Sequence, residues 1–195
     1  MPCLIDYSIK RPCGLASVGV QAIAIANIEE FKAISTAISG AKDGLINKTE
    51  FSSWFASGKG FYAWQTAKDS VTANSTIAVG DSPEFKTITE TVSGKFVGTP
   101  SKEDDGDIIP LSADEINSVL AGSFCIAVLY KDGRIKFYGL SQDGLSCSQW
   151  DEDTSTGGVT FTFTGSNMYT PFQADADATA GLTWNDVLTI KGTAG

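Results

Sequence analysis

Alternating hydrophobic and polar positions predict β-strands along most of the chain. Residues 18–28 (VGVQAIAIANI) alternate in part, and their largely apolar composition indicates a buried strand. Residues 61–67 alternate aromatic and small side chains, residues 72–80 follow as a further strand, and residues 157–166 alternate with a period of two. Together with the strands expected around residues 124–138, this pattern predicts roughly seven to nine strands, mostly antiparallel. Such a set favours a β-sandwich or an open barrel.

The longest strand-like run covers residues 84–99 (EFKTITETVSGKFVGT). Side chains alternate between the two faces of a strand, so every second residue of this run shares a face. One face would carry Phe85, Thr87, Thr89 and Thr91, and the other Glu84, Lys86, Ile88, Glu90 and Val92. Neither face is strongly apolar. We therefore expect one face of this strand to lie against water or against a partner.

One segment, about 111–122 (LSADEINSVLAG), has a clear helical pattern. Ser112 stands at the N-cap position and Glu115 follows three residues later, which is the spacing of a capping box. Gly122 is a typical residue for the helix end. The sequence thus predicts a mainly β (α+β) fold, with an antiparallel sandwich or open barrel and one flanking helix. No linker divides the chain, so residues 1–195 are expected to form a single domain.

Glycine marks the predicted turns. Asp132-Gly133 and Asp143-Gly144 lie in the stretch 124–145 (FCIAVLYKDGRIKFYGLSQDGL), and Asp-Gly readily adopts the positive φ of tight hairpin turns. Residues 40–60 hold several turn signals and suggest a hairpin or an extended loop. Residues 29–38 are expected to form either a helical turn or more strand. Residues 100–110 are expected to form a polar loop, and residues 187–190 a short strand.

The composition excludes several kinds of chemistry. The chain has 14 basic and 23 acidic residues, a net charge of −9, so its surface should repel phosphate. It has no histidine, which removes Ser-His-Asp and Cys-His catalysis and His-ligated metal sites. The acidic run 103–107 lacks the anchor positions of a calcium loop. We expect no enzyme activity, catalytic residue, metal or cofactor.

The four cysteines are Cys3, Cys13, Cys125 and Cys147. They form no CxxC pair, and Cys125 lies in an apolar strand where a free thiol packs as a core residue. The sequence leaves open whether Cys3 and Cys13 pair. The first residues lack the pattern of a secretion signal, and no run is long enough for a membrane span. We therefore expect synthesis in a reducing cytoplasm, with free thiols and no membrane association.

A group of aromatic residues spans a glycine-rich connection: Trp54, Phe55, Phe61, Tyr62 and Trp64. These side chains could cap the core. They could also form an exposed patch that docks on another subunit, because Trp and Tyr are enriched in interface cores.

Two regions together resemble the tail tube (major tail) proteins of phages that infect Bacteroidetes bacteria. The first contains Cys3, Arg11-Pro12-Cys13-Gly14 and the strand-like residues 19–27 (GVQAIAIAN). The second is the run 127–145 followed by 157–172 (GGVTFTFTGSNMYTPF), which is similar to the strand, turn and strand order of that family.

The resemblance implies a virion protein whose partners are further copies of itself, in stacked and usually hexameric rings, and other tail proteins. Strands of each subunit would form an inner barrel through which genome DNA passes without specific binding. By position, Glu84, Lys86 and Glu90 are expected on a lumen-facing or subunit-facing strand. The segment 40–65, with Trp54, Phe55, Phe61 and Trp64, is expected to be the contact between rings.

Two other functions fit the sequence. The chain could be another structural protein of a virion or an injection machine, such as a head decoration protein, a tail terminator or a contractile inner tube. It could also be a carbohydrate- or surface-binding β-module, for which Trp54, Tyr62 and Trp64 would supply an aromatic platform. The oligomeric state separates these functions, because a tube subunit should form rings or polymerise whereas a binding module can be monomeric.

Overall fold

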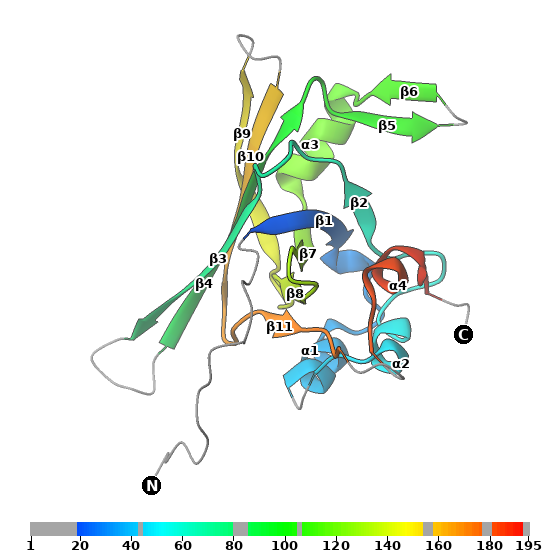
Figure 1. Ribbon diagram of the computed structural model, residues 1–195, viewed down its shortest axis with the longest axis vertical. Helices are drawn as coiled ribbons and strands as arrows, with labels where there is room; N and C mark the ends of the chain where they lie inside the picture. Colours follow the sequence, from blue (N-terminus) through cyan, green and yellow to red (C-terminus); the bar gives the residue numbers. More distant parts are fainter. Residues whose placement is uncertain are drawn as a thin grey trace, which may run out of the picture.

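Nine of the strands in the computed structural model form one antiparallel sheet (Figure 1). The structure describes residues 19–42, 45–79, 86–104, 107–153, 158–176 and 181–192. The sheet runs in the order β11-β8-β7-β9-β10-β4-β3, and β1 pairs with both β7 and β2. Its strands are β1 (Val20–Asn27), β2 (Tyr62–Trp64), β3 (Thr72–Val79), β4 (Lys86–Val97), β7 (Ser123–Tyr130), β8 (Ile135–Tyr138), β9 (Leu145–Asp153), β10 (Gly158–Asn167) and β11 (Phe172–Gln173). The fold is mainly β, as predicted, and these strands do not close into a barrel.

The large sheet has two halves that face each other across a core. Strand β7 pairs with β9 only where Ser123 and Phe124 lie opposite Ser146 and Leu145, so the halves are joined at one short junction. We call β9, β10, β4 and β3 the front sheet, and β2, β1, β7, β8 and β11 the back sheet. Phe161 and Phe163 of the front sheet belong to the same buried cluster as Ile126 of the back sheet. The two halves therefore pack as a sandwich, as predicted.

The other face of the back sheet is covered by helices (Figure 1). Helices α1 (Ile34–Lys42), α2 (Lys48–Ser52) and α4 (Trp184–Thr189) border a second core, into which β1 and β7 direct small residues such as Ala24 and Ala127. The small side chains leave room for a cluster of phenylalanine and tryptophan rings. A 3₁₀ turn (Ile28–Glu30) follows β1. No helix in the described segments is long and apolar enough to span a bilayer.

Several local predictions are confirmed. Helix α3 (Ala113–Ala121) starts with the predicted capping box, in which the Ser112 N–H donates to Glu115 Oε2 at 2.8 Å and the Glu115 N–H donates to Ser112 Oγ at 3.3 Å. The two Asp-Gly pairs form turns, with φ of +86° at Gly133 and +63° at Gly144. The first joins β7 to β8, and the second precedes β9.

Three segment predictions are wrong. Residues 40–60 contain the end of α1 and all of α2 rather than a hairpin, because Asn47 and Glu50 form a capping box. Residues 101–104 and 107–110 are not a loop but the paired strands β5 (Ser101–Asp104) and β6 (Asp107–Pro110). Residues 187–189 lie in α4 rather than in a strand, because a Thr183–Asp186 capping box starts a helix there. The described residues therefore contain four α-helices, not one.

Candidate interaction surface

The outward face of the front sheet is lined with hydroxyl groups. In β4, Ile88 and Val92 point into the core, so Thr89 and Thr91 between them point outward. In β10 the buried residues Val159, Phe161 and Phe163 alternate with outward-facing threonines in the same way. The sequence TFTFT at 160–164 carries this pattern, which predicts a strand.

The strand register aligns these hydroxyl groups into rows. Thr91 pairs with Asn74 on one side and with Thr164 on the other, and Thr89 lies between Thr76 and Ser166. We call the resulting surface the hydroxyl face. Its residues are Thr72, Asn74, Thr76, Thr87, Thr89, Thr91, Ser93, Thr160, Thr162, Thr164 and Ser166.

Hydrogen bonds connect neighbouring strands across the hydroxyl face. The hydroxyl groups of Thr72 and Ser93 are 2.8 Å apart, and those of Thr91 and Thr164 are 3.3 Å apart. At one end of the face, the register places Lys95 and Asp151 on either side of Thr160. These two opposite charges leave the described part of the face close to neutral. A neutral, hydrogen-bonded face of this kind binds phosphate only weakly, because it offers no concentrated positive charge.

Strand β3 forms the edge of the front sheet. It pairs with β4 through eight consecutive residue pairs without a register shift, and no other described strand pairs with it. Natural edge strands are usually protected by lysine, proline or a bulge, which prevent pairing with another chain. The β3 sequence TANSTIAV has no charge and no proline, and Ile77 is half exposed. This edge is therefore suited to pairing with a further strand.

Of the three residues predicted on a lumen-facing or subunit-facing strand, the structure describes the side chain of Glu90. Glu90 is fully buried on the inner side of β4, so its own side chain does not face a lumen or a subunit, whereas the prediction that its strand does so stays a prediction. Its Oε2 atom accepts the Gly139 N–H at 2.5 Å. Burial raises the pKa of Glu90 to about 7, although the Gly139 hydrogen bond and the nearby Asn167 amide lower it. Lys86 is the first residue of β4, but its side chain is not described. Glu84 lies outside the described residues.

The predicted interface aromatics lie inside the protomer. Trp54, Phe55 and Phe61 are at most 4% exposed and belong to the core between the back sheet and the helices. Rings of Trp54 and Phe137 meet edge-on at 5.4 Å between centroids. The expectation of an exposed patch is thus wrong for these three side chains, and their role is to fill the core. Trp64 is half-buried and packs against the core between the two sheets.

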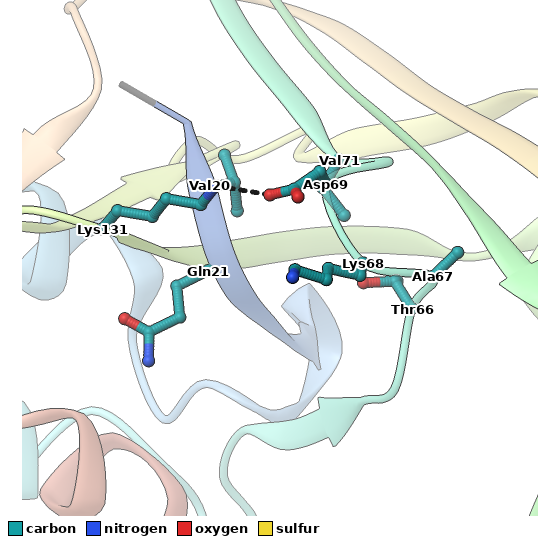
Figure 2. Close-up of a pocket in the computed structure, with 8 residues that line it drawn as sticks. All are labelled: Val20, Gln21, Thr66, Ala67, Lys68, Asp69, Val71 and Lys131. Atoms are coloured by element: carbon teal, nitrogen blue, oxygen red, sulfur yellow. Dashed lines mark hydrogen bonds and ion pairs between the residues drawn. The ribbon is translucent and has the colours of Figure 1, made fainter. Parts of the chain in front are cut away.

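A small pocket lies where β1 meets the turn before β3 (Figure 2). It has a volume of about 170 Å³ and is lined in part by Val20, Gln21 and Lys68. Lys131 Nζ forms an ion pair with Asp69 at its rim, and this pair lowers the pKa of Asp69. Small-molecule sites usually measure about 300–1,000 Å³, so this pocket is too small for a typical organic ligand.

The described residues show no arrangement for nucleophilic or metal chemistry. No group of three or more metal-binding side chains occurs in them. Burial raises the pKa of both the Cys125 and the Cys147 thiols, which disfavours the reactive thiolate form. Comparison of the chain with known protein families, curated proteins and solved structures finds no match. The candidate function therefore rests on the hydroxyl face and on the edge of β3, with which no further described strand pairs.

Proposed function

We propose that the protein is a structural virion subunit that assembles into stacked rings, forming the tail tube through which a phage genome is delivered. The open edge of β3 carries this proposal. A regular, uncharged edge of eight residues offers unpaired backbone groups that a second copy can satisfy by adding a strand. The resemblance in residues 3–27, 127–145 and 157–172 supports the same proposal.

A ring requires a head-to-tail contact in which two different surfaces of neighbouring copies meet. Strand β9 lies at the opposite side of the front sheet, where helix α3 contacts it. Beyond Ser146, it pairs only with β10 among the described strands. Pairing of β3 in one copy with β9 in the next would join the front sheets into one continuous wall.

The hydroxyl face would then line the channel of the tube. Hydroxyl groups exchange hydrogen bonds with water readily, and they hold phosphate far less strongly than Lys or Arg. The net charge of −9 opposes tight binding of DNA to the protein as a whole. DNA would thus pass along the channel without specific binding. The proposed location is the virion tail, with other tail proteins at the ends of the tube.

A carbohydrate- or surface-binding module has less support. Such a module needs an exposed aromatic platform, whereas Trp54 is buried and Trp64 is half-buried. Tyr62 is 49% exposed, but Lys191 Nζ lies over its ring at 4.2 Å from the centroid. Another structural role in a virion or injection machine would also use the β3 edge, and the presence or absence of a hollow tube separates it from our proposal.

Charged residues placed on β3 test the assembly contact. The double variant Asn74→Lys and Thr76→Lys adds two of the charges that protect natural edge strands. The matched control, Asn117→Lys and Ala121→Lys, adds the same charge to exposed positions of α3. Sedimentation velocity at increasing concentration should show assembly of the wild type and the control, and protomers only for the β3 variant with an unchanged circular dichroism spectrum. Assembly of the folded β3 variant at wild-type concentrations would refute pairing through β3.

A further inference from the structure

The two outer strands of the front sheet are protected differently. The edge of β3 pairs with no further described strand, and its sequence has no charged residue or proline. The edge of β9 after Ser146 also has no strand partner among the described strands, but helix α3 lies against it (Figure 1). A covering helix is one of the ways in which natural proteins keep an edge strand from pairing with another chain. One edge is therefore covered, and the other is open.

The strand register explains why α3 occupies this position. Ser123 of β7 lies opposite Ser146 of β9, so an earlier start of β7 would continue the ladder along the residues after Ser146. The chain forms α3 there instead, because the capping box at Ser112 and Glu115 starts a helix. Its nine residues span about 14 Å, which is the length of about four strand residues. The helix is thus long enough to cover the first part of the β9 edge.

The contacts that hold α3 in place are weak. No residue of the helix is buried: Ile116 and Val119 are half-buried, and Leu120 is 42% exposed. Val119 packs against the core between the two sheets. An ion pair of 2.7 Å joins Lys102 of β5 to Glu115, but both side chains are more than a third exposed, and such surface pairs contribute little. Little apolar surface would therefore become exposed to water if α3 left β9.

Gly122 connects α3 to β7 and brings the helix close to the strand. A Cβ atom at this position would lie 2.4 Å from Phe124 Cζ and 3.0 Å from the Ser118 carbonyl oxygen. Strand β7 itself is held by its pairing with β1 and β8. A backbone rotation at Gly122 can therefore move α3 while β7 stays in the back sheet.

We propose that α3 is a displaceable cover of the β9 edge, which moves aside when β3 of the next copy pairs with β9. This inference rests on the proposed function, in which β3 and β9 form the contact between subunits. A head-to-tail contact needs both edges, so covering one of them is enough to keep protomers apart at low concentration. Growth of the tube is then a competition between α3 and an incoming β3 for the same strand.

A truncation of Val119 tests the cover. Val119→Ala removes part of the apolar contact that holds α3, whereas the matched control Leu120→Ala shortens an exposed side chain of the same helix. The truncation removes the burial of about one methyl group, so the concentration at which assembly begins should fall about fourfold. Sedimentation velocity should show this fall in Val119→Ala and the wild-type threshold in the control. An unchanged or higher threshold in folded Val119→Ala would overturn the inference.

Hydrogen exchange of the wild-type protein follows the cover and the covered strand separately. In assembled tubes the amides of α3 should exchange faster than in the protomer, and those of β9 after Ser146 more slowly. Protection of β9 without faster exchange in α3 would overturn the cover and leave the contact between subunits intact. A complete absence of assembly in the wild type and in both variants would overturn the proposed function together with this inference. If Val119→Ala does not fold, the exchange of the wild type decides.

Discussion

The buried carboxyl group of Glu90 predicts an unusual dependence of stability on pH. Its pKa is about 7 in the folded protein, against an ordinary value of 4.5. Between these values the folded state holds a proton that the unfolded state releases. The stabilisation is therefore complete below pH 4.5 and is lost as the pH rises through 7. Each pKa unit corresponds to about 1.4 kcal/mol, so the free energy of unfolding should fall by about 3 kcal/mol.

This effect can be separated from the other titrations of the chain. The pKa values of Asp69, Asp132 and Asp186 are lowered, mainly by hydrogen bonds from a neighbouring Lys or Arg. Their contributions are present above their ordinary pKa of 3.8 and are lost at lower pH, outside the range of Glu90. The chain has no histidine, the side chain that ordinarily titrates between pH 5 and 8.

Urea unfolding followed by tryptophan fluorescence measures the effect. The wild type, Glu90→Gln and the control Glu152→Gln would be compared from pH 5 to 8.5. We expect the free energy of unfolding of the wild type and the control to fall by about 2.5 kcal/mol relative to that of Glu90→Gln over this range, because part of the effect is already lost at pH 5. Parallel curves for the wild type and Glu90→Gln would refute the reasoning, because the pH dependence would then come from other groups.

Three further substitutions test the packing. Gly94→Ala should lower the free energy of unfolding by about 1–3 kcal/mol, because a Cβ atom there would lie 2.7 Å from Phe161 Cζ; unchanged urea unfolding would contradict this contact. Trp54→Ala should cost about 3–5 kcal/mol by leaving a cavity, whereas lost assembly with unchanged stability would show an exposed interface residue instead. Ser112→Ala should lower the melting temperature through a loss of about 1 kcal/mol at the start of α3, and Ser118→Ala, in the same helix, is the control.

The sequence predicted elements wherever local signals were strong. The alternation in β10 and the capping box at Ser112 required no knowledge of the rest of the chain. The alternation in β4 was also correct, but it left open which of the two faces points outward. Charged residues are rarely buried fully, and the burial of Glu90 depends on the Gly139 N–H, which satisfies one of its oxygen atoms inside the core. That contact joins residues 49 positions apart and has no local signal.

The burial of the aromatic residues between positions 54 and 61 likewise depends on contacts that have no local signal in the sequence. Trp54, Phe55 and Phe61 suit a core and an interface equally well as residue types. Their burial results from the helices that cover the back sheet, and α2 and α4 are too short for hydrophobic periodicity to predict them. An ion pair of 2.7 Å between Lys48 and Asp186 joins these two helices and could not be seen in the sequence. The alternating threonines that form the hydroxyl face can be recognised in the sequence. Their alignment into rows depends on the register between separate strands.

Electron microscopy of the purified wild-type protein at increasing concentration tests the proposed function most directly. Our account predicts hollow rings that stack into tubes, with β3 of each copy at the boundary between neighbouring subunits and the hydroxyl face toward the channel. Assemblies in which β3 faces solvent, or a protein that stays a protomer at the highest concentration even when a preformed tail tip is added to start the tube, would contradict it.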